Sequence, residues 1–107
     1  MDNLTIIVDY NKIQSFGTVE QVLDLKPLKA KFEAFNWECL EIDGHNHKEI
    51  YDSLIDLPIK EYRPTAIIAH TIKGKGVDFM ENELPWHYKS PTKEQFERAI
   101  RQIEKSL

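Results

Sequence analysis

The 107-residue sequence is poor in the features that define several large classes of protein. It has a single cysteine, Cys39, which excludes an intrachain disulfide and a cysteine-rich zinc site. No apolar run approaches the roughly 20 residues that a membrane-spanning helix needs, and the N-terminal segment lacks the basic start of a secretory signal. Its four glycines and five prolines form no low-complexity linker, and no internal repeat is visible. We therefore expect one cytoplasmic unit over residues 1–107, with no membrane segment.

Acidic residues outnumber basic ones. The chain has 14 basic and 18 acidic residues, which gives a formal net charge of −4. Electrostatic binding along a nucleic-acid backbone needs many lysines and arginines on one face, so the charge balance argues against a nucleic-acid partner. A local exception is the pair Lys73 and Lys75, which suits a small anion better than a polynucleotide.

Short apolar runs alternate with amphipathic segments along the chain. The runs at residues 4–8, 37–42 and 65–71 predict strands, and the unbroken apolar character of the first predicts a strand covered on both faces. Apolar residues at helical spacing predict helices over residues 25–35, 47–57 and 92–107, and Thr92 and Gln95 form a capping-box pattern before the last one. The order is βαβαβα, which indicates an α/β fold with three layers, a partial doubly wound parallel sheet.

Polar side chains follow each predicted strand. In open parallel sheets, ligands bind beyond the carboxyl ends of the strands, so we expect the functional site in residues 9–17, 43–47 and 70–87. The last of these ranges overlaps a stretch of roughly 18 residues with little periodicity, from 73 to 91, which predicts a long loop that is either functional or disordered.

The first of these segments contains Asp9, Asn11, Ser15 and Gly17. An asparagine oxygen and a backbone carbonyl are ligands that Mg²⁺ accepts. An ordinary turn, in which Asp and Asn bond their own backbone, is the alternative and is favoured by spacing alone.

The run His70-Thr-Ile-Lys-Gly-Lys-Gly76 combines two glycines with two lysines after a strand, so backbone N–H groups and an ammonium group have the chemistry to bind phosphate. It lacks the spacing of a P-loop, and a solvated basic turn is the alternative. His87, in an aromatic setting, is suited to donate to phosphate or to move a proton, unless Trp86 simply anchors the loop and leaves it exposed. His45 and His47 have no third ligand nearby, and we interpret them as turn and helix-cap residues.

Taken together, these motifs resemble the C-terminal half of the pyrophosphate-binding domain of transketolase, a thiamine diphosphate enzyme. The resemblance spans almost the whole chain and is carried by NLTIIVDYNKIQSFG (residues 3–17), EIDGHNH (41–47) and AHTIKGKGVDFMENELPWHYKSP (69–91). The last segment is the most specific, because the lysine of its KGKG turn and the histidine after tryptophan have the family's separation.

The resemblance implies a role for several residues. Asn11 would bind Mg²⁺ through its side chain, and Ile13 through its backbone carbonyl. Lys73 would reach the cofactor's diphosphate, and His87 would lie near the diphosphate and the reacting sugar. Asp9 matches a family acid beside the metal loop, where it would organise the ligands rather than bind the metal.

The resemblance is partial. The family's Gly-Asp-Gly motif would precede Met1, so the aspartate metal ligand is missing, and Tyr88 stands where members often have glycine. We therefore expect a fragment, whether cloned, split or proteolytic, of a dimeric enzyme of the pentose phosphate pathway that transfers ketol units between sugar phosphates. Its partners would be the missing N-terminal half and the pyrimidine-binding domain or subunit, and the isolated chain would be inactive. A noncatalytic interaction module and a piece of another thiamine diphosphate enzyme, such as a deoxyxylulose-phosphate synthase, remain alternatives.

Overall fold

The computed structural model describes residues 1–14 and 16–107, so Ser15 lies outside the described residues. Its contacts group into two compact units, Met1–Asn11 with Asp24–Thr71 and Lys12–Leu23 with Ile72–Leu107. The first unit contains β1 (Thr5–Tyr10), α2 (Leu28–Ala34), β4 (Glu38–Asp43), α3 (His47–Ile55) and β5 (Thr65–His70). The second contains β2 (Ile13–Gln14), β3 (Gly17–Thr18), α1 (Val19–Val22), the 3₁₀ helix η1 (Leu84–His87) and α4 (Lys93–Ser106).

A parallel sheet of order β1-β5-β4 forms the centre of the first unit. Thr65, the first residue of β5, pairs with Thr5 on one side and with Glu38 on the other. The central strand is the core of this unit: Ile67 and Ile68 are 1% and 0% exposed. The apolar run at residues 65–71, which predicted a strand, therefore identifies β5 correctly.

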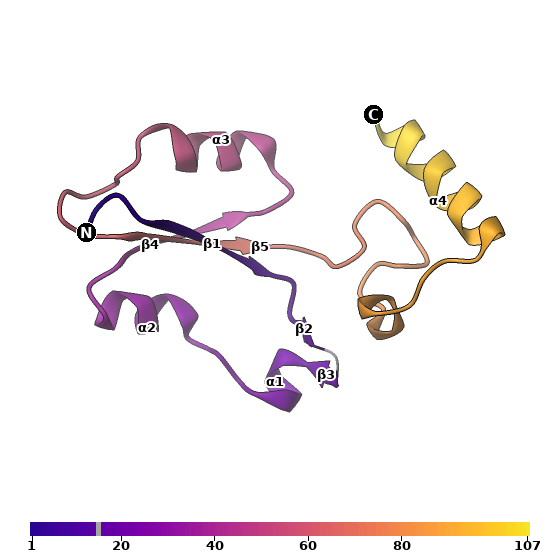
Figure 1. Cartoon of the computed structure of the whole chain (residues 1–107), viewed down its shortest axis with the longest axis horizontal. Coiled ribbons are helices and arrows are strands. Elements are labelled where there is room, and N and C mark those ends of the chain that lie inside the picture. Colours follow the sequence, from indigo (N-terminus) through magenta and orange to yellow (C-terminus); the bar gives the residue numbers. More distant parts are fainter. Residues whose placement is uncertain (15) are drawn as a thin grey trace. The chain divides into compact units, whose positions relative to one another are not determined.

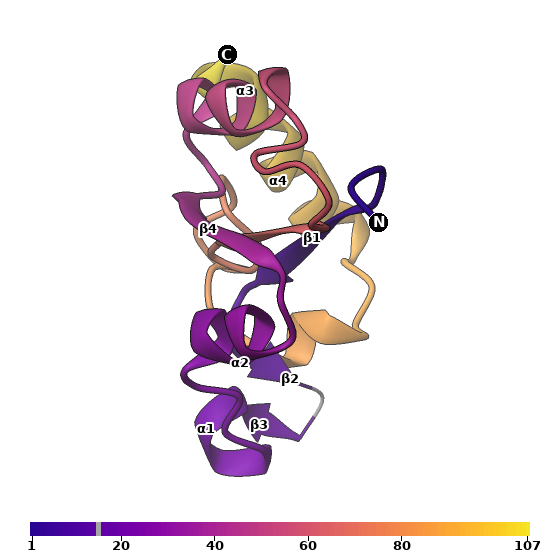
Figure 2. The same ribbon diagram turned by 90° about the vertical axis from the view of Figure 1, so that its left-hand side faces the viewer.

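Helices cover both faces of this sheet. Figure 1 shows α3 on one side of the edge-on strands and α2 on the other, and Figure 2 gives the same arrangement from the side. Because β5 lies between β1 and β4, the two successive crossovers run in opposite directions across the sheet and place their helices on opposite faces. The predicted three-layer α/β fold with a parallel sheet is confirmed.

Asparagines next to the helices determine where α3 begins and how the chain leaves α2. Asn46 Oδ1 accepts hydrogen bonds from the backbone N–H groups of Lys48, at 3.0 Å, and Glu49, at 3.3 Å, so Asn46 caps α3 and His47 is its first residue. The interpretation of His47 as the cap was therefore wrong by one position. After α2, Asn36 adopts a left-handed conformation with φ 62°, which asparagine tolerates well, and turns the chain into β4.

The prediction that the first strand is covered on both faces is wrong. The side chain of Ile7 in β1 is 59% exposed, because β1 is an edge strand of the β1-β5-β4 sheet. An apolar run is typical of a strand that is buried on both faces. The run alone does not show whether neighbouring elements cover those faces. No helix in residues 1–14 and 16–107 has the length and apolarity to span a bilayer.

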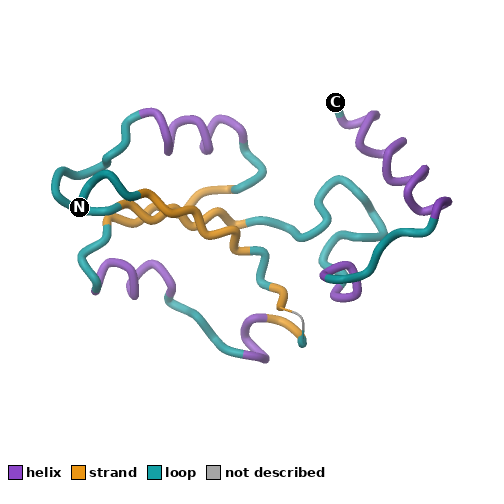
Figure 3. The backbone as a smooth tube through the Cα atoms, viewed as in Figure 1, coloured by secondary structure: helices purple, strands orange, loops and turns teal. Residues whose placement is uncertain are grey.

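Apart from the 14-residue α4, the second unit consists of short elements and loop, and Figure 3 distinguishes helix, strand and loop by colour. β2 and β3 form a small antiparallel hairpin that leads into α1. The predicted capping box of α4 is confirmed: Gln95 N–H donates to Thr92 Oγ1 at 3.3 Å, and Thr92 N–H donates to Gln95 Oε1 at 2.9 Å. The predicted long loop between β5 and α4 contains the turn of η1.

Candidate cofactor-binding site

The carboxyl ends of β1 and β5 meet at one edge of the sheet. Tyr10 pairs with His70, and the Thr71 N–H donates to the Tyr10 carbonyl at 3.3 Å. The Thr71 hydroxyl donates to the carboxylate of Asp9, which ties the two strand ends together. Asn11, the predicted metal ligand, follows this junction directly.

The turn after β4 reaches the same edge. Gly44 N–H donates to the His70 carbonyl at 2.8 Å. A Cβ on Gly44 would lie 2.5 Å from the Thr71 side chain, so only glycine permits this close packing. All three predicted site segments therefore have residues at the carboxyl end of β5, as expected for a parallel sheet.

The backbone between the two predicted metal ligands is unusual. Lys12 has φ 66°, a left-handed conformation that costs a non-glycine residue roughly 1–2 kcal/mol. The Lys12 carbonyl accepts a hydrogen bond from Val19 N–H at 2.9 Å, which holds this turn against the start of α1. Such outliers cluster at binding sites, where the surrounding structure maintains them.

Ile13 lines a pocket of about 160 Å³ in the second unit. Asn82 lies on the same pocket, and its N–H donates to the Lys73 carbonyl at 2.9 Å. Asn82 also has a left-handed backbone, with φ 57°. The sequence reasoning missed Asn82, for which an asparagine in a loop without periodicity is the only available signal.

Lys73 opens the KGKG turn, whose backbone N–H groups are mostly used inside the turn. Lys75 N–H donates to the Ile72 carbonyl at 3.1 Å, Val77 N–H to the Gly74 carbonyl at 3.1 Å, and Gly76 N–H to Glu81 Oε1 at 3.1 Å. The expectation that these N–H groups converge on phosphate is therefore not met by those three groups. The half-buried Lys73 side chain is a candidate phosphate donor of the turn.

His87 ends η1 and is exposed. The preceding Trp86 is half-buried and packs against Phe79, with ring centroids 5.4 Å apart. η1 also contacts β2, which begins with Ile13. The structure has the arrangement of the alternative interpretation, in which Trp86 anchors the loop and His87 is exposed. A role of His87 toward phosphate or in proton transfer stays a prediction.

The structure thus places Ile13, Lys73 and His87 in the second unit, and Asn11 and Asp9 in the first. Asn11 lies two residues before Ile13 in the chain. His45 lies in the turn after β4, as predicted. In the described part of the chain, no group of three His, Cys, Asp or Glu side chains has the arrangement of a metal site.

Comparison with known proteins gives the family. The model for "transketolase, thiamine diphosphate binding domain" matches residues 1–103. The chain belongs to the transketolase family. The predicted resemblance is thereby confirmed.

The transketolase relatives include whole enzymes and enzyme subunits. A subunit of the apulose-4-phosphate transketolase of Phocaeicola vulgatus is 36% identical over 107 residues, which are 100% of this chain and 38% of that protein. Human transketolase is 31% identical over 103 residues, 96% of this chain and 16% of its own length. The crystal structure of transketolase from Campylobacter jejuni superposes with a TM-score of 0.84 at 31% identity, covering 96% of this chain and 16% of that chain. This transketolase-family chain therefore spans well under half the length of these relatives.

Proposed function

We propose that this chain is the C-terminal half of the thiamine diphosphate-binding domain of a transketolase-type transferase, and that it anchors the cofactor's diphosphate and Mg²⁺. The observation that supports this most strongly is the junction at the carboxyl ends of β1 and β5. Asn11 directly follows it, and the KGKG turn begins two residues after Thr71. Parallel sheets bind ligands at this edge.

Each proposed site residue contributes a group of the right chemistry. The Asn11 amide oxygen and the Ile13 carbonyl are hard oxygen ligands for Mg²⁺, and the Lys73 ammonium neutralises diphosphate charge. His87, exposed on η1, donates to the diphosphate and contacts the reacting sugar. Thiamine diphosphate supplies the carbanion chemistry when it is bound. Asp9, held by Thr71, organises the metal loop without binding the metal.

Two neutral oxygen ligands do not compensate the charge of Mg²⁺, so the fit is incomplete within this chain. We propose that the remaining ligand comes from the preceding half of the domain and that the pyrimidine ring binds to another domain or subunit. Several relatives are named as single subunits of transketolases, which supports an enzyme built from more than one chain. The isolated chain is then inactive and binds thiamine diphosphate weakly or not at all; the assembled enzyme, a cytoplasmic dimer of the pentose phosphate pathway, transfers two-carbon ketol units between sugar phosphates.

A graft tests this function. Residues 1–103 replace the matched segment of Campylobacter jejuni transketolase, and ketol transfer from a ketose phosphate to an aldose phosphate is measured by product chromatography. We expect the graft to be active with Mg²⁺ and thiamine diphosphate. Asn11→Ala, Lys73→Ala and His87→Ala should each lower kcat/KM by about 100-fold, the usual cost of removing a positioning or electrostatic group.

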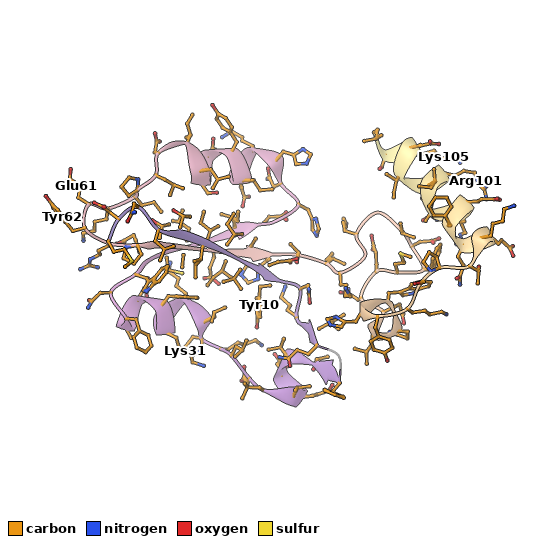
Figure 4. All side chains as sticks on the ribbon, viewed as in Figure 1. Tyr10, Lys31, Glu61, Tyr62, Arg101 and Lys105 are labelled. Carbon is orange, nitrogen blue, oxygen red and sulfur yellow. The ribbon has the colours of Figure 1, made fainter. Side chains whose placement is uncertain are left out.

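The matched control is Arg101→Ala, which removes a charge from the exposed surface of α4 (Figure 4). This variant should retain the activity of the unchanged graft. A graft that melts cooperatively but binds no thiamine diphosphate in calorimetry would overturn the proposal. Activity that survives all three alanine substitutions would do the same.

The second candidate function is an interaction module. Its support is the edge strand β1, where Ile7 is 59% exposed, because unprotected edges and apolar side chains favour association. Light scattering at several concentrations tests it: a mass that rises with concentration and returns to that of a monomer in Ile7→Lys supports the module. A wild-type chain that stays monomeric throughout counts against it.

A further inference from the structure

Two cations and two aromatic rings form a continuous row in the second unit. The Arg98 guanidinium lies over the Phe79 ring at 5.2 Å, the Phe79 and Trp86 centroids are 5.4 Å apart, and Lys89 Nζ lies over the Trp86 ring at 4.9 Å. We call these four residues the cation–aromatic row. It connects α4 with η1, two elements separated in sequence by the segment around Pro91.

The α4 end of the row is fixed by polar contacts. Arg98 Nη2 donates to Asp78 Oδ2 at 2.5 Å, and Asp78 N–H donates to Gln102 Oε1 at 3.0 Å. Arg98 and Gln102 are one helical turn apart on α4, so Asp78 is held by two side chains of the same helix face. The guanidinium that lies over Phe79 is thus fixed in orientation by a charged hydrogen bond.

The η1 end of the row needs such support. η1 has only four residues; Trp86 N–H donates to the Glu83 carbonyl at 3.2 Å, and the Pro85 carbonyl accepts from Tyr88 N–H at 3.5 Å and from Lys89 N–H at 3.0 Å. A single 3₁₀ turn has little stability of its own, because the hydrogen-bond geometry of 3₁₀ helices is poorer than that of α-helices. The half-buried Trp86 ring therefore holds the turn in place, and His87 is the next residue.

We propose that Arg98 is a positioning residue for His87, acting through Phe79 and Trp86. Arg98 orients the Phe79 ring, Phe79 fixes the face of Trp86, and Trp86 sets the direction in which the exposed imidazole projects from η1. The use of that imidazole toward a diphosphate or a sugar rests on the proposed function. The positioning itself is a property of the chain.

The test is the NMR spectrum of the His87 ring in the full 107-residue chain. The reference for an unpositioned ring is a peptide of residues 84–89. In Arg98→Ala, the His87 ring signals should move most of the way toward those of the peptide, while the amide signals of β1, β4 and β5 stay unchanged. In Arg98→Lys, the His87 ring signals should stay close to those of the wild-type chain, because a lysine ammonium also binds an aromatic face.

Two further variants separate positioning from general stability. Phe79→Leu keeps an apolar side chain and leaves the Arg98–Asp78 pair in place, yet it removes the ring between the cation and Trp86; it should shift His87 with α4 intact. Arg101→Ala makes the same charge change one turn along the helix, at a residue with no ion pair or ring contact among the described residues, and should leave His87 unchanged.

The proposal is overturned if the His87 signals do not move in folded Arg98→Ala, or if they move equally in Arg101→Ala. If Arg98→Ala unfolds α4, Phe79→Leu decides: an unmoved His87 there overturns the proposal. Failure of the proposed function is a separate result, since it is read from ketol transfer in the graft and not from these signals.

Discussion

Glycine at position 74 is required by both backbone conformation and space, and this gives a quantitative prediction. Gly74 has φ +78°, and a Cβ built there would lie 2.5 Å from the Met80 carbonyl oxygen and 2.6 Å from its carbon. The conformation costs an alanine roughly 1–2 kcal/mol. Contacts this short also force the backbone of Met80 to move, and overpacking of this kind costs a further 1–3 kcal/mol or so.

Gly76 provides a matched control in the same turn. It has φ +95°, but a Cβ there would meet nothing within 4 Å. We therefore expect Gly74→Ala to lower the free energy of unfolding of the second unit by about 3 kcal/mol, and Gly76→Ala by about 1 kcal/mol. The difference between the two losses of unfolding free energy gives the cost of the contact with Met80, because the conformational penalty is common to both variants and cancels.

Urea unfolding followed by Trp86 fluorescence measures these values, with Trp37→Phe as the common background so that the signal reports on the second unit. Amide exchange at Asn82, whose N–H donates to the Lys73 carbonyl, gives an independent local reading. Equal losses in the two alanine variants would refute the reasoning, because they would mean that the contact with Met80 has no energetic consequence. An unchanged free energy of unfolding in Gly76→Ala would refute the predicted cost of placing alanine in a left-handed conformation.

Three other predictions concern stability. Thr92→Ala should lower the free energy of unfolding by about 1 kcal/mol in urea titrations by removing the cap of α4, whereas Thr92→Ser, which keeps the hydroxyl, should be close to wild type. Hydrogen bonds from the Gln102 side chain and then from Arg98 lower the pKa of the Asp78 carboxyl from its ordinary 3.8. Because the folded pKa is depressed, this stabilisation is present above pH 3.8 and lost as the pH falls through the lower folded value, and Asp78→Asn should abolish that part of the pH dependence of the urea midpoint. Thr71→Val, which removes the hydroxyl bonded to Asp9, should cost about 1 kcal/mol, and a thermal melt equal to that of Thr71→Ser would contradict it.

The larger elements of the first unit could be predicted because period and composition determine them. The run TAIIAHT predicts a strand, and β5 is the most buried of the described elements. The run of β1 looks similar, but Ile7 is exposed, since burial also depends on neighbours that a local pattern does not specify. The parallel topology followed from strand–helix alternation and brought the turn after β4 to the end of β5.

Apart from the 14-residue α4, which the sequence predicted, the second unit was harder to predict because its elements are short. β2 and β3 have two residues each, too few to show a period, and α1 has four. A signal for α1 was nevertheless present: Thr18 and Gln21 form a capping box like that of Thr92 and Gln95. The KGKG turn also bonds to residues later in the loop, as in the hydrogen bond from Gly76 N–H to Glu81 Oε1. The spacing of residues in the sequence does not reveal such bonds.

The strand order also has a consequence for synthesis. The middle strand of the sheet is the last of the three to be translated, so neither outer strand has a partner in the sheet until residue 65 has been made. Thr5 pairs with Thr65, which is 60 positions later in the chain, whereas Glu38 is only 27 positions before the same residue. A nascent chain that pauses before this point carries two unpaired apolar segments, and this is the stage at which a chaperone would have most effect on yield.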